Sequence, residues 1–346
     1  MVLTHLIVAA SAFQNTMHPR VVHVRMVPTV SAAAPPASPV LRSALIIGGS
    51  SSAISWAASA AFAMCTYKPH RIVHNSIGTS QALTALPLLA ACIFVLANSQ
   101  EGPASGLDTA ETRRLALGVA AACVWSAVTV VWAPSFTSAV VRTMDPVIYP
   151  LTLRLCATAS HLGLAGVCLA AWRRAGGTVR TLIDGIARAP WDLGPPAHGA
   201  EGSSGGDVAV CATLSLAFLA LTGIALAAPF PLATVPSLLG KRCARAFGAW
   251  TLLAAVALQT LKAMVSRLAN ANSPGSATEV GAAGGGSVSS AVGVLRLGLR
   301  AMSVAHLGIM LARPLVETVS VYPAAMACLP ATLMSVLVYV AVAVCV

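Results

Sequence analysis

The sequence predicts an all-α fold: a polytopic transmembrane helix bundle of about eight spans, with a range of seven to ten, arranged in two halves. Two observations lead to this prediction. Hydrophobic residues make up 57% of the chain and charged residues only 9%, whereas a soluble domain carries about 25% charged residues. Apolar stretches of the roughly 20 residues that a bilayer crossing needs recur along the chain, and most charges lie between them.

The first membrane half is expected to cover residues 43–172 and to hold about four helices. Before it, residues 1–42 combine arginines with a proline cluster and predict a flexible basic N-terminal tail. Within this tail, residues 1–14 are apolar but lack a basic start, which favours an interfacial segment over a cleaved signal peptide. The four expected spans are Ser43–Thr66, Ser76–Asn98, Leu115–Ala133 and Val147–Trp172.

Two local features are expected within this half. Pro87 should kink the second span, because proline removes a helical hydrogen bond that neighbouring helices then compensate. Residues 99–114 combine charged residues with Gly and Pro, and they predict an exposed loop.

A polar segment rich in Gly, Pro and Ser, residues 173–207, separates the two halves, and its composition cannot pack a core. The second membrane half is expected to cover residues 208–346, again with about four helices. Its expected spans are Val208–Ala228, Ala246–Val265, Val292–Ala312 and a crossing within Pro314–Val346. Basic residues in the loops favour both termini and the central loop on the cytoplasmic side.

The net charge of +11 raises the question of a nucleic-acid partner. The basic residues lie singly or in pairs beside apolar runs, without interleaved aromatic residues, which indicates contact with anionic lipid instead. We therefore expect the lipid bilayer as a partner and no nucleic acid. The sequence leaves the oligomeric state open.

Ionisable side chains at membrane depth are costly and by default suggest function. Six such side chains form a possible intramembrane polar site: Arg154, His161, Lys262, Arg296, Arg300 and His306. Arg296 and Arg300 are spaced to share one helix face, which would suit a pathway for an anion. The alternative is that the cations near helix ends pair with other groups or extend to the lipid headgroups.

No pattern in the sequence indicates catalysis. No carboxylate falls centrally within an expected span, which disfavours proton- or sodium-coupled transport. His70 and His74 have a metal-binding spacing but no Cys or carboxylate beside them, and the nine cysteines include no C-x-x-C pair. The sequence also lacks H-E-x-x-H, Walker A, G-x-S-x-G and G-x-G-x-x-G motifs. We expect no enzyme activity, no catalytic residues, no metal and no cofactor.

Four features in order carry a family resemblance. A Gly/Ser/Ala-rich first span leads to a basic turn and His70-Arg71-Ile72, and a Gly/Pro/acidic loop then leads into the run at 115–121. A long polar loop splits the membrane region, and residues 317–322 follow Arg313 before the last apolar run. Over about residues 43–335 this order resembles the multi-pass envelope membrane proteins of alphaherpesviruses encoded by their forty-third unique-long reading frame. More distantly, the architecture looks like equilibrative nucleoside transporters.

The resemblance implies a non-enzymatic viral envelope protein with an accessory role in assembly, entry or modulation of membrane fusion. It implies residence in the virion envelope and host membranes, and other viral envelope proteins as partners. The distant likeness implies an alternative, a facilitative transporter of a small, nucleoside-like solute. A cellular membrane protein without a viral link is a third interpretation.

Overall fold

The computed structural model describes residues 37–66, 84–101, 107–131, 151–182, 203–227, 238–271, 285–316 and 336–346. Almost all of these residues are helical, and none of them lies in a strand. The prediction of an all-α protein is therefore confirmed for this part of the chain. The predicted tail lies outside the described residues up to residue 36, and its last residues already belong to the first helix.

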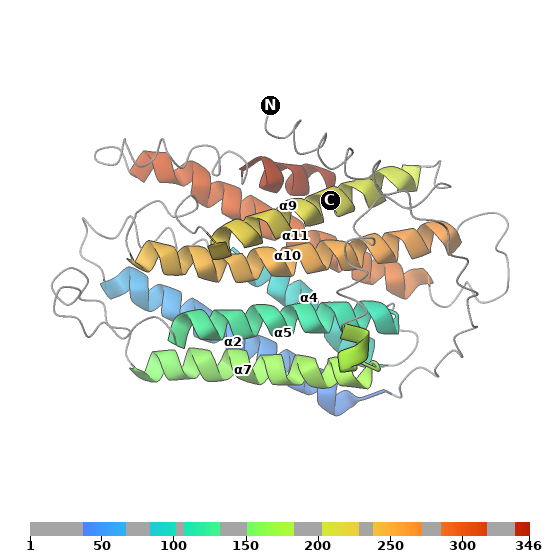
Figure 1. Cartoon of the computed structure of the whole chain (residues 1–346), viewed down its shortest axis with the longest axis horizontal. Helices are drawn as coiled ribbons and strands as arrows, with labels where there is room; N and C mark the ends of the chain where they lie inside the picture. Colours follow the sequence, from blue (N-terminus) through green and yellow to red (C-terminus); the bar gives the residue numbers. More distant parts are fainter. Residues whose placement is uncertain are drawn as a thin grey trace. The chain divides into compact units, whose positions relative to one another are not determined.

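Figure 1 shows the helices in chain order along the colour bar. The labelled helices are α2 (Pro39–Thr66), α4 (Leu86–Asn98), α5 (Thr109–Val131), α7 (Leu151–Arg174), α9 (Ser203–Ala227), α10 (Leu238–Ala271) and α11 (Gly285–Val316). A 3-10 turn, η1 (Ser99–Glu101), follows α4, and a short apolar helix, Val336–Cys345, ends the chain. Each segment predicted as a span overlaps one of these helices. Because α7 reaches Arg174 and α9 starts at Ser203, helix extends into the predicted polar segment 173–207 from both sides.

Four of these helices are long and apolar enough to cross a bilayer: Leu155–Arg174, Gly206–Leu226, Gly248–Ala269 and Val288–Ile309. Two further apolar helices, Leu86–Glu101 and Val336–Cys345, are shorter. These four long apolar helices suggest an integral membrane protein. The count of eight spans stays a prediction.

Two local predictions in the first half are wrong. Pro87 does not kink a helix, because α4 begins at Leu86 and Pro87 lies in its first turn. There the missing N–H costs nothing and the fixed φ of proline suits the helix. The second half of the predicted exposed loop 99–114 is also helical, since α5 begins at Thr109, and Glu111 is buried.

Contacts between side chains show how neighbouring helices run. Between α9 and α10, the Ser215 hydroxyl donates to the carbonyl oxygen of Ala255 over 3.0 Å, and the hydroxyls of Thr222 and Thr251 lie 2.9 Å apart. The later contact residue on α9 meets the earlier contact residue on α10, so these two helices are antiparallel. Hydroxyl contacts of this kind hold helices together where lipid supplies no water to compete.

Close approach of two helix pairs depends on glycine. A Cβ added at Gly118 of α5 would lie 2.5 Å from Cγ1 of Val256 on α10. A Cβ added at Gly298 of α11 would lie 2.5 Å from Cβ of Ala91 and 3.2 Å from the carbonyl oxygen of Pro87, both on α4. Small residues allow such packing between membrane helices.

Large apolar side chains also face outward. On α7, Leu155, Leu162 and Leu169 recur at heptad spacing and are all exposed. The opposite side of α7 packs inward through residues such as Leu164 and Cys168, which are fully buried. A helix that is apolar on both its inner and outer sides is typical of a membrane span.

Candidate functional site

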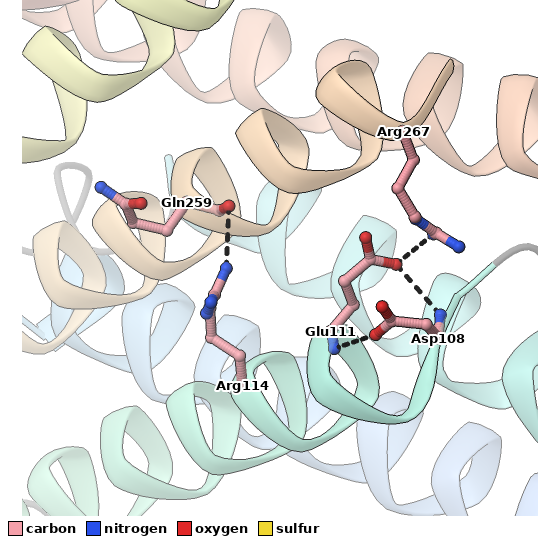
Figure 2. A network of polar contacts seen from close by, with 5 residues as sticks. All are labelled: Asp108, Glu111, Arg114, Gln259 and Arg267. Carbon is pink, nitrogen blue, oxygen red and sulfur yellow. Dashed lines mark hydrogen bonds and ion pairs between the residues drawn. The ribbon is translucent and has the colours of Figure 1, made fainter. Parts of the chain in front are cut away.

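A polar network joins the start of α5 to α10 (Figure 2). The N–H of Glu111 donates to Oδ1 of Asp108 over 2.7 Å, and the N–H of Asp108 donates to Oε2 of Glu111 over 3.0 Å. This reciprocal pair is a capping box, which satisfies two N–H groups at the start of a helix. It fixes the first turn of α5 and holds the Glu111 carboxylate beside that turn.

Glu111 has a second partner on a neighbouring helix. The guanidinium of Arg267 on α10 donates to Oε2 of Glu111 and forms an ion pair with it. The Glu111 side chain is 3% exposed and that of Arg267 is 38% exposed. Burial raises the pKa of Glu111 to about 7, because desolvation outweighs the stabilisation of the carboxylate by the Asp108 N–H and by Arg267.

Two further arginines of α5 bind the backbone of neighbouring segments. The guanidinium of Arg114 donates to the carbonyl oxygen of Gln259 on α10 over 3.1 Å, as Figure 2 shows. The guanidinium of Arg113 donates to the carbonyl oxygen of Gly176, just beyond α7, over 3.4 Å. The charged first turns of α5 therefore attach this helix to α10 and to the end of α7.

His161, one of the residues predicted from sequence, lies where α2, α7 and α10 meet. It is fully buried, and its Nδ1 lies 2.5 Å from the hydroxyl oxygen of Ser52 on α2. Its ring lies 5.2 Å from that of Trp56 and 6.5 Å from that of Trp250 between centroids. In the part of the chain with defined placement, Nε2 of His161 and Nε1 of Trp250 are buried without a hydrogen-bond partner. We call Ser52, Trp56, His161 and Trp250 the histidine–tryptophan cluster.

His306 lies in a different aromatic environment. It is buried on α11, and its ring stacks on Tyr339 of the last helix at 4.0 Å between centroids. Tyr339 in turn meets Phe218 of α9 edge-on at 5.4 Å. These contacts attach the last helix to α9 and α11.

The predicted cations are placed differently from the histidines. Arg296 forms an ion pair with Asp207 at the start of α9, with 2.8 Å between Nη2 and Oδ2. Cys211 lies one turn along α9 from Asp207 and near both Arg296 and Lys262, so Lys262 belongs to the same region. Arg300 is exposed. Arg154 lies on α7, and its side chain is outside the described residues.

The structure therefore does not gather the five described side chains of this predicted set into one site. Lys262 and Arg296 share a region near Asp207, whereas each histidine packs in its own aromatic cluster. Arg296 faces a carboxylate, which agrees with the alternative of structural pairing that the sequence left open.

Sequence reasoning missed the Glu111 network. The sequence does contain a signal for the capping box, because Asp108-Thr109-Ala110-Glu111 before an apolar run has the spacing of that motif. The pairing with Arg267 has no such signal, since the two residues are far apart in sequence.

Comparison of the chain with models of protein families, with curated proteins and with solved structures finds no match. The class of protein therefore rests on the fold itself: four long apolar helices suggest a helical integral membrane protein.

Proposed function

We propose that this protein is a non-enzymatic, multi-pass viral envelope membrane protein with an accessory role in assembly, entry or modulation of membrane fusion. It resides in the virion envelope and in host membranes, and its partners are other viral envelope proteins. The order of sequence features over about residues 43–335 suggests the viral family, and the contacts of the helices support a role without catalysis.

The observation that carries this proposal is the use of buried polar side chains as contacts between helices. Ser52 meets His161 between α2 and α7, and Thr222 meets Thr251 between α9 and α10. Glu111 meets Arg267 between α5 and α10. Polar groups used in this way stabilise a bundle. The exposed apolar side chains of α2 and α7 leave surface for lipid and for other membrane helices.

The test uses the tagged full chain in cells that produce enveloped virus. We expect the chain in gradient-purified, protease-treated particles, and we expect it to co-purify with envelope glycoproteins after mild detergent extraction. A tagged multi-pass protein of the host membrane serves as the control, and it should be depleted from both fractions. Purified particles that lack the chain would overturn the viral proposal.

The histidine–tryptophan cluster favours the alternative, a facilitative transporter of a small nucleoside-like solute. Binding sites for small solutes present a few polar atoms among apolar and aromatic walls, and Nε2 of His161 and Nε1 of Trp250 are such atoms. Transport would appear as uptake of radiolabelled nucleosides into proteoliposomes above the level of protein-free liposomes. It should fall in Trp250→Phe and persist in Leu162→Phe, a change at an exposed position of α7. Uptake equal to that of protein-free liposomes would remove this alternative.

A further inference from the structure

Glu111 is a buried carboxylate with one oxygen engaged and the other free. Oε2 accepts the N–H of Asp108 over 3.0 Å and also the guanidinium of Arg267. Oε1 is buried and finds no hydrogen-bond partner in the residues that the structure describes. The described residues therefore supply donors to only one of the two carboxylate oxygens.

This arrangement disfavours the charged form. A carboxylate out of water is costly unless hydrogen bonds and an opposite charge compensate it fully. Here half of the acceptor capacity is unused. The opposing Arg267 side chain is 38% exposed, so water and salt weaken its attraction. A proton on Oε1 would remove the charge and leave Oε2 free to accept both of its present donors.

The other charged groups on the helices around Glu111 do not change the conclusion that its charged form is disfavoured. Asp108 opposes the charge of Glu111, Arg267 on α10 favours it, and these two act on the carboxyl. Arg113 and Arg114 bind backbone oxygens beyond α7 and on α10. Other described charged residues on neighbouring elements include Glu101 of η1, which is paired with Arg42, and Arg173 and Arg174 at the end of α7.

We propose that Glu111 is a proton-binding site, and that proton uptake at Oε1 favours the contact of α5 with α10 because it removes a charge that this contact buries, so that the attachment of α5 to α10 responds to pH. The start of α5 is preserved in both states. The Asp108 Oδ1 that accepts the Glu111 N–H does not depend on the charge of the Glu111 side chain. The change therefore acts on the contact between the helices and leaves the helix itself capped.

Proton binding can be followed directly with the full chain in proteoliposomes. The measurement is the carbonyl stretch of protonated carboxyl groups in infrared difference spectra as the pH is lowered. We expect one band that titrates near neutral pH, that disappears in Glu111→Gln and that persists in Glu101→Gln. Glu101 is the matched control, because it is also at a helix end and paired with an arginine but is half-exposed. A neutral-range band that survives in Glu111→Gln, or its absence in the native chain, would overturn the proposal.

Two further variants test the role of Arg267. Arg267→Gln should move the midpoint of the band to higher pH, because the opposing charge is lost while burial remains. Arg267→Lys should bring it part of the way back. An unchanged midpoint in Arg267→Gln would show that the ion pair does not influence the proton site.

The effect on the helix contact has its own readout. Spin labels carried by noncanonical residues at Ala110 of α5 and Ala269 of α10 report the distance between the two helix ends without involving the native cysteines. On acidification through the neutral range we expect the distance distribution to narrow in the native chain and to stay constant in Glu111→Gln. The same narrowing in both chains, or broadening in the native chain, would contradict the coupling to α10.

Discussion

Gly298→Ala is expected to destabilise the protein strongly, because α11 packs so closely on α4 at Gly298 that there is no room for a side chain. The new Cβ would lie 2.5 Å from Cβ of Ala91 and 3.2 Å from the carbonyl oxygen of Pro87. Neither atom can rotate away, since one is fixed to the backbone and the other is part of it. Overpacking of this kind costs about 1–3 kcal/mol. Thermal unfolding in detergent, followed by circular dichroism, should show a clear fall in the midpoint.

Gly293→Ala is the control on the same helix. Gly293 is exposed, and no atom lies within 4 Å of a Cβ added there. Its replacement should leave the midpoint unchanged or raise it, since alanine in a helix is favoured over glycine by roughly 0.5–1 kcal/mol. Equal losses in the two variants would show that α4 and α11 do not approach each other closely at Gly298.

The second large effect is the pH dependence of stability that Glu111 contributes. Its pKa in the folded protein is about 7, raised from an ordinary value of 4.5. The folded state therefore binds this proton more tightly than the unfolded state does. It follows that the contribution to the free energy of unfolding is lowest above pH 7 and increases as the pH falls from about 7 to about 4.5. At 1.36 kcal/mol for each pH unit, the full change is at most about 3 kcal/mol.

Glu111→Gln isolates this contribution. Glutamine retains the capping box but does not titrate, so the variant should lose the Glu111 part of the slope between about pH 7 and about 4.5. It should also be more stable than the native chain at mildly alkaline pH, where the native carboxylate is charged. Denaturant unfolding of both chains across this range measures the difference. Parallel stability curves would mean that Glu111 titrates as an ordinary glutamate.

The positions of the helices follow from the sequence because each apolar run must satisfy its backbone internally in lipid. The run Ser43–Thr66 became α2, which starts slightly earlier, at Pro39. The exact ends were less predictable, because polar residues continue a helix where neighbours bind them. Residues 109–114 show this: they are rich in charge, which is typical of a loop, but the carbonyl oxygens of Gly176, just beyond α7, and of Gln259 on α10 bind Arg113 and Arg114.

The candidate site was predictable only in part. His161 was singled out because an ionisable side chain in an apolar run is unusual, and its buried contact with Ser52 gives a structural reason for it. The burial of Glu111 was not predictable, because it requires α10 to cover the start of α5. That arrangement depends on packing between distant segments, including the close approach of Gly118 to Val256, and no local pattern encodes it.

The central claim is that hydrocarbon surrounds the outer faces of these helices, and membrane extraction tests it most directly. Membranes from cells that express the full chain are treated with alkaline carbonate and floated through a density gradient. The account predicts that the chain floats with the lipid and leaves it only in detergent. Release of the chain into the aqueous fraction by carbonate alone would contradict the account.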